Sequence, residues 1–94
     1  MPMKKTNVSD FLILVTIENK RYVSDPEGET ILRDLVVKGG YTNVKSIRTT
    51  RNLKVTVTAK SKSIAEESVR KMCEELRIFN PVTSNCFVNA IGAQ

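Results

Sequence analysis

The run from Phe11 to Asn19 constrains the fold most, because six of its nine residues are apolar and five of them are consecutive. Every second residue from Phe11 to Ile17 falls on one face of a β-strand, and Leu12 and Leu14 fall on the other. A strand with apolar residues on both faces is central in a sheet, or its outer face meets a partner. Both faces of this strand must therefore be covered, either by the rest of the chain or by another molecule.

A first helix is expected after a short loop. Asp25 is a favourable N-cap, Pro26 suits the first helical position, and the acidic residues that follow complement the positive end of the helix dipole. Gly39-Gly40 is expected to end this helix, since glycine tolerates the left-handed conformation. The expected buried stripe consists of Ile31, Leu32, Leu35 and Val36.

Two strands are predicted next, over Val44 to Arg51 and Leu53 to Lys60, with a tight turn near Thr50 to Asn52. The second alternates strictly between apolar and polar residues, which is typical of a half-buried strand. The first is less regular, and its spacing suggests a bulge or a late start.

A second helix follows, for which Ser63 and Glu66 have the spacing of a capping box. Asn80-Pro81 is expected to stop it, and Val82 to Ile91 then reads as the last strand. The helix carries an apolar stripe at steps of three and four residues, which consists of Ala65, Val69, Met72, Leu76 and Phe79.

The predicted order is therefore β-α-β-β-α-β, which indicates an α+β fold. We expect a two-layer sandwich in which an antiparallel sheet carries both helices on one face. A length of 94 residues fits one domain over residues 1–94, with a flexible tail at 1–10 and a C-terminal tail at 92–94.

The net charge is +5, from 15 Lys and Arg against 10 Asp and Glu, and there is no His. The lack of His removes the commonest general base and metal ligand, so we expect no catalytic, cofactor-binding or metal-binding residues on this chain. Between Leu35 and Ala65 there are no acidic residues. The basic stretch there fits nucleic acid, a phosphorylated ligand, an acidic protein surface or a solvated face, and comprises Lys38, Lys45, Arg48, Arg51, Lys54, Lys60 and Lys62.

Cys73 and Cys86 are the only cysteines and lack the C-x-x-C spacing. Two Cys without His cannot complete a zinc site. We see no secretory signal, and no segment approaches the ~20 apolar residues of a membrane span. We therefore expect a cytoplasmic protein with reduced, buried thiols, although a disulfide stays possible in principle.

RNA binding is one alternative for a basic domain of this element order. Base stacking needs aromatic side chains on the central strands, but Leu53 to Lys60 has none. Phe11 lies at the start of its strand, and Tyr22 and Tyr41 lie in predicted loops. Charge alone supports this alternative.

A small acyl-phosphate hydrolase is a second alternative, in which Arg21 would act with Asn19 or Asn43. No glycine-rich phosphate loop surrounds Arg21, and the adjacent Glu pairs of the second helix splay apart. A phosphate at the helix start near Lys20 is also disfavoured, because three carboxylates surround that position.

Four segments occur in an order and spacing that point to one family. They are Asp25-Pro26-Glu27-Gly28, then Gly40-Tyr41-Thr42-Asn43-Val44 leading into Ile47-Arg48, then Met72-Cys73-Glu74-Glu75-Leu76, and last Asn80-Pro81-Val82. From about Phe11 to Val88 the chain resembles the small PurS subunit of phosphoribosylformylglycinamidine synthase.

This resemblance implies a non-catalytic scaffold in an ATP-dependent carbon-nitrogen ligase of purine biosynthesis. In this family the small subunit joins a glutaminase subunit (PurQ) to a large synthetase subunit (PurL), and it also associates with itself, as a dimer or tetramer. The complex converts formylglycinamide ribonucleotide, ATP and glutamine into formylglycinamidine ribonucleotide. By the resemblance, ATP and Mg belong to the synthetase subunit, and the small subunit helps ammonia to pass between the other two.

The resemblance also singles out eight positions of this sequence. We expect them to shape turns or contact partners, without forming a catalytic set, and they are Asp25, Pro26, Gly28, Tyr41, Asn43, Arg48, Asn80 and Pro81.

Overall fold

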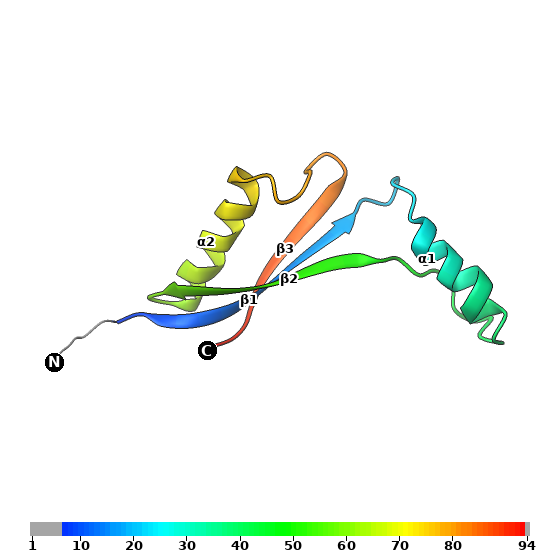
Figure 1. Ribbon diagram of the computed structural model, residues 1–94, viewed down its shortest axis with the longest axis horizontal. Coiled ribbons are helices and arrows are strands. Elements are labelled where there is room, and N and C mark those ends of the chain that lie inside the picture. Colours follow the sequence, from blue (N-terminus) through cyan, green and yellow to red (C-terminus); the bar gives the residue numbers. More distant parts are fainter. Residues whose placement is uncertain (1–6, 94) are drawn as a thin grey trace.

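β1 (Ser9–Asn19) lies in the middle of an antiparallel sheet of order β2-β1-β3 (Figure 1). The sheet is seen in a computed structural model that describes residues 7–93. β1 pairs with β2 (Thr50–Ala59) from Ser9↔Ala59 to Glu18↔Thr50. It pairs on its other side with β3 (Ser84–Ala93), with an irregularity between Leu12 and Ile13. The central position predicted for the first strand is confirmed.

One helix, α2 (Lys62–Glu75), covers one face of this sheet. Burial of each large aliphatic side chain there contributes about 1.5–3 kcal/mol, so this interface holds the sheet and α2 together. The fold is α+β, as the sequence predicts. The buried apolar residues of the core are Ile13, Val15, Ile17, Ala59, Ala65, Val69, Cys73 and Val88.

The first helix does not lie on the sheet, which corrects the expected sandwich with both helices on one face. It consists of α1 (Pro26–Thr30) and a π-helical continuation, η1 (Ile31–Val37), and these two segments contact each other but no other element of residues 7–93. Figure 1 shows this helix projecting from one end of the sheet. The molecule measures 63 × 29 × 14 Å with a radius of gyration of 18.4 Å, against about 12 Å for a compact chain of this length.

The expected strand over Val44 to Arg51 is wrong for most of its length. Only its last two residues belong to β2, and the segment before them returns from η1 without strand pairing. The predicted turn at Thr50 to Asn52 lies instead inside the ladder, with Asn52 opposite Thr16. The physical reason is that Thr50 to Asn52, which the expected hairpin needs for its turn, are extended and paired with β1. The segment before them therefore cannot fold back onto β2.

The structure also corrects the ends of several elements. β1 includes Ser9 and Asp10, and β3 extends to Ala93, so these residues are not tails. Residues 1–6 and 94 of the expected tails lie outside the described residues.

The start of α2 differs from the predicted capping box. Ser61 is the N-cap, and its Oγ accepts a hydrogen bond from the Ile64 N–H at 3.2 Å. The side chain of Glu66 instead accepts from the Ala90 N–H of β3 at 2.7 Å. Glu66 therefore binds β3 and does not cap α2.

Both helices end in the same hydrogen-bonding pattern. After η1, Gly40 has φ of 101°, its N–H donates to Val37 O at 3.0 Å, and the Tyr41 N–H donates to Val36 O at 3.1 Å. This is a Schellman motif, which confirms the predicted glycine stop. α2 ends in the same way, but Arg77 occupies the left-handed position with φ of 54°.

Replacing Arg77 with Gly should stabilise the fold, because an L-residue with a side chain is strained in the left-handed region. We expect Arg77→Gly to raise the free energy of unfolding by about 0.5–1 kcal/mol and the melting temperature by a few degrees. Glu75→Gly, inside the last turn of α2, should cost about 1 kcal/mol. Thermal and urea unfolding measure both, and a less stable Arg77→Gly variant would contradict the assignment.

Candidate functional site at the base of the helical arm

Residues 20–49 form an arm that leaves the sheet after β1 and returns to it before β2 (Figure 1). Two connections come together where the arm meets the sheet. The outgoing connection is residues 19–25, from the end of β1 to the start of α1, and the returning connection is residues 38–49, from η1 to β2. Of the eight predicted positions, Asp25, Pro26, Gly28, Arg48, Asn80 and Pro81 lie at or beside this arm base, whereas Tyr41 and Asn43 lie beyond the far end of η1. Their role as contact sites stays a prediction.

The carboxylate of Asp25 links the two connections. It is buried and caps α1 by accepting a hydrogen bond from the Gly28 N–H at 3.1 Å. It also accepts from the N–H of Thr49 and, at 3.0 Å to each oxygen, from the Thr49 hydroxyl. The hydrogen bond from the Thr49 N–H is the main reason that the pKa of Asp25 lies below its usual value of 3.8.

Arg48 makes a second link, for which the returning connection supplies the charged side chain. Its Nη2 donates to three main-chain carbonyls of the outgoing connection, those of Asn19 at 3.4 Å, Lys20 at 3.2 Å and Val23 at 3.0 Å. The two hydrogens of this one nitrogen are shared among the three acceptors. Two adjacent residues of the returning connection therefore hold the outgoing one by side chain and main chain.

Gly28 allows the close approach on which these links depend. A Cβ atom at this position would lie 2.9 Å from the carboxylate of Asp25 and still nearer to the carbonyl oxygen of Ile47. The returning connection thus passes directly over the first turn of α1, where a side chain has no room.

The loop between α2 and β3 holds the outgoing connection from the other side. The Lys20 N–H donates to Thr83 O at 2.8 Å, and Lys20 Nζ donates to Pro81 O at 2.9 Å. The hydroxyl of Tyr22 donates to Val82 O. Asn80 shapes this loop, because its main-chain carbonyl and its side chain accept hydrogen bonds from the residues that follow.

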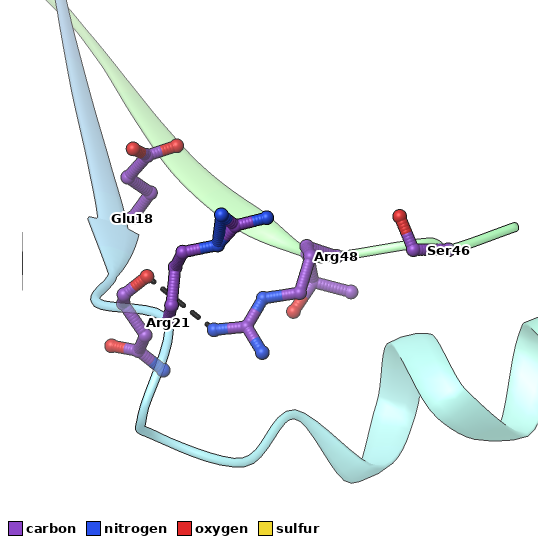
Figure 2. Close-up of a pocket in the computed structure, with 6 residues that line it drawn as sticks. Glu18, Arg21, Ser46 and Arg48 are labelled. Atoms are coloured by element: carbon purple, nitrogen blue, oxygen red, sulfur yellow. Dashed lines mark hydrogen bonds between the residues drawn. The ribbon is translucent and has the colours of Figure 1, made fainter.

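A cleft of about 480 Å³ opens at the arm base. Figure 2 shows Arg21 and Arg48 extending into it from the two connections, with Glu18 at the end of β1. Within residues 7–93 no group of three or more His, Cys, Asp or Glu residues is placed to hold a metal ion. The lining is suited to ionic contact with another molecule, and it contains no pair of an activated nucleophile and its base.

Two apolar surfaces lack cover within the described chain. On the arm, Leu35 and Tyr41 are 66% and 64% exposed. On the sheet face opposite α2, Phe87 of β3 is 47% exposed, beside the half-buried Leu14 of β1, and Ile91, at the irregularity of β3, is 50% exposed. A short isolated helix is marginally stable in water, and contiguous exposed apolar residues mark interaction surfaces.

The sequence did not point to two of these features. Thr49 was missed because one hydroxyl residue in a polar stretch carries no signal until Asp25 is brought beside it. Phe87 could have been found, since alternation along β3 places it on the face opposite Cys86 and Val88.

No helix of the described residues is long and apolar enough to cross a membrane.

These features define a small α+β chain whose sheet and helical arm leave apolar surfaces available to other molecules. Residues 12–91 match the PurS family of phosphoribosylformylglycinamidine (FGAM) synthase, and the chain belongs to this family. A PurS subunit of that synthase from Archaeoglobus fulgidus is 40% identical over 68 residues, 72% of this chain and 82% of the relative. The Thermotoga maritima subunit is 39% identical over 72 residues, 77% and 85% respectively.

Solved structures agree with this assignment. The crystal structure of the T. maritima PurS subunit has a TM-score of 0.78 at 34% identity, covering 89% of this chain and 94% of that one. A chain in the structure of PurLQS from T. maritima has a TM-score of 0.74 at 34% identity, covering 87% and 98%. Methanocaldococcus jannaschii PurS, a subunit of formylglycinamide ribonucleotide amidotransferase, has a TM-score of 0.74 at 27% identity, covering 89% and 99%.

Gly28→Ala should weaken the arm base, because the added methyl group meets the Ile47 carbonyl and the Asp25 carboxylate. Overpacking of this kind typically costs 1–3 kcal/mol, so we expect about that loss in the free energy of unfolding. Gly92→Ala is the matched control, since no atom lies within 4 Å of a Cβ built there. Equal stability of the two variants in urea unfolding would contradict the close approach.

Acid should loosen the arm base through Asp25. Because the folded-state pKa of Asp25 lies below 3.8, its contribution to stability is present above that pH and is lost as the pH falls through the folded-state pKa. In Asp25→Asn this part of the pH dependence should disappear, and the midpoint of urea unfolding near neutral pH should be lower. Urea titrations from about pH 7 to about pH 2 measure both. Parallel pH curves for the two proteins would contradict the role of the carboxylate.

Proposed function

We propose that this chain is a non-catalytic scaffold subunit of phosphoribosylformylglycinamidine synthase. In this proposal it bridges the glutaminase and synthetase subunits and helps ammonia to pass between them, while ATP and Mg bind the synthetase and no cofactor binds this chain. The observation that carries the proposal is a helix, α1 with η1, that packs against no other helix or strand of residues 7–93, in a member of the PurS family.

The exposed apolar side chains of the arm helix are the physical support for this proposal. The helix made of α1 and η1 is short, and its exposed Leu35 and Val37 have no intramolecular cover among the described residues. Ordering such a segment costs conformational entropy that burial of apolar surface against a partner can offset. The links at the arm base hold the arm in one direction, so a partner meets a preformed surface.

Self-association as a dimer or tetramer is part of the same proposal. A second copy could cover these surfaces, because the arm of one copy and the open sheet face of another both carry apolar side chains that residues 7–93 leave exposed. The first strand, with apolar residues on both faces, agrees with this arrangement. A cytoplasmic location also belongs to the proposal, in keeping with a biosynthetic enzyme complex.

RNA binding is not favoured by the structure. The basic stretch is divided between the arm, β2 and the start of α2, and β2 has no aromatic residue. Phe87 is exposed, but it lies on an edge strand among Asn residues and not on the central strand. A stacking platform for several bases is therefore not formed by the described residues.

The purified chain, mixed with its glutaminase and synthetase partners, nucleotide and glutamine, should co-elute with them on gel filtration. Leu35→Gln should weaken assembly about tenfold or more, because burial of a Leu side chain contributes about 1.5–3 kcal/mol. Glutamine-dependent product formation should fall with it, whereas formation from added ammonia should change little, because the reaction on the synthetase is left intact.

Glu29→Gln is the matched control, since Glu29 is an exposed residue of α1 and receives the same new side chain. It should assemble as the unmodified chain does. Analytical ultracentrifugation of the chain alone separates loss of self-association from loss of partner binding. Absence of co-elution under every such condition would refute the scaffold role.

A further inference from the structure

α2 and β3 run in opposite directions, and one hydrogen bond fixes their register. The side chain of Glu66 in α2 accepts from the Ala90 N–H of β3 at 2.7 Å. Further along α2, Val69 is buried beside the sheet, as is Val88 on β3. Residues nearer the end of α2 therefore lie beside residues nearer the start of β3.

This register brings the two cysteines together. Cys73 lies two helical turns beyond Glu66, about 10 Å along α2 and on the same side of the helix. Cys86 lies four residues before Ala90, about 13 Å along β3 and on the same face of the strand. Cys73 belongs to the core, and Cys86 packs against it.

The properties of the thiols agree with this placement. Both cysteines are free in the structure. Burial raises the pKa of the Cys86 thiol, and the neighbouring Cys73 thiol raises it further. Arg70 and Glu74 of α2 are the charged groups that act on Cys86, with opposite effects on its pKa.

We propose that Cys73 and Cys86 form a reversible modification site, which closes into an intramolecular disulfide in the presence of a small-molecule disulfide oxidant. In the first step the Cys86 thiolate attacks the oxidant, forms a mixed disulfide and releases one small thiol. In the second step the Cys73 thiolate attacks the Cys86 sulfur, forms the protein disulfide and releases the second small thiol. The protein loses two electrons and two protons, and the oxidant is reduced to two thiols.

The order of these steps follows from exposure. Cys86 is half-buried and can meet the oxidant, whereas Cys73 is only 1% exposed. The raised pKa of the Cys86 thiol disfavours the attacking thiolate, so the first step is slow.

The disulfide would act on the arm base, and this goes beyond the proposed scaffold function. The closed ring from Cys73 to Cys86 contains the whole loop between α2 and β3. Carbonyl oxygens of this loop, those of Pro81 and Thr83, hold Lys20 in the outgoing connection of the arm. Oxidation would therefore restrict the loop that anchors the arm, at a distance from the arm itself.

The full chain is incubated with oxidised glutathione, and remaining thiols are trapped by alkylation. We expect both thiols to disappear together, with a mass about 2 Da lower and a peptide linking Cys73 to Cys86. The melting temperature should rise by roughly 10 °C, because the cross-link restricts the unfolded chain. Hydrogen exchange of the Lys20 and Ser84 amides should slow, and a reducing agent should reverse every change.

Two variants make the expected order of steps testable. Cys73→Ala should accumulate a stable mixed disulfide at Cys86, and Cys86→Ser should leave Cys73 unreactive in the folded chain. A lasting mixed disulfide at Cys86 of the unmodified chain would overturn the proposal, as would a disulfide between two chains or oxidation only in denaturant. No partner subunit is needed, so the outcome is independent of the scaffold role.

Discussion

The contact between Asp25 and Thr49 is the constraint on which the rest of the molecule depends. It ties the start of α1 to the residue before β2, so the helix and the returning segment leave the sheet together. Without such a link, a helix between two strands of this sheet would be free to fold back onto a face. With it, α2 covers one face of the sheet, and no other helix of residues 7–93 packs on the sheet.

The arm base combines three different kinds of contact at one place. Asp25 supplies a buried carboxylate, Arg48 donates to main-chain carbonyls, and Gly28 leaves room for the backbone of Ile47. The loop between α2 and β3 closes the same region through Lys20. The arm is thus directed by polar contacts at its base, while its apolar surface remains available along its length, which is the arrangement expected of a subunit that completes its packing in an assembly.

Local signals in the sequence were reliable where a residue acts on its immediate neighbours. Asp25 caps α1, Pro26 begins it, and Gly40 ends η1 in the left-handed conformation, all as expected. The local signals were wrong where a residue of a distant element binds the side chain in question. Glu66 has the spacing of a capping box, but its carboxylate serves the Ala90 N–H of β3, and the cap comes from Ser61.

The sequence by itself determined the α+β class, the central place of β1, the burial of Ala65 and Val69 in α2 and the family, because periodicity and short motifs report on what each segment buries. The expected burial of Leu76 at the end of α2 and of Leu35 in the first helix is wrong, since both side chains are exposed. Only the tertiary structure decided that residues 44–49 pair with no strand and that the first helix leaves the sheet. The reason is that both outcomes depend on contacts between residues far apart in the chain, such as Asp25 with Thr49. The same holds for the cysteines, whose proximity depends on the register between α2 and β3.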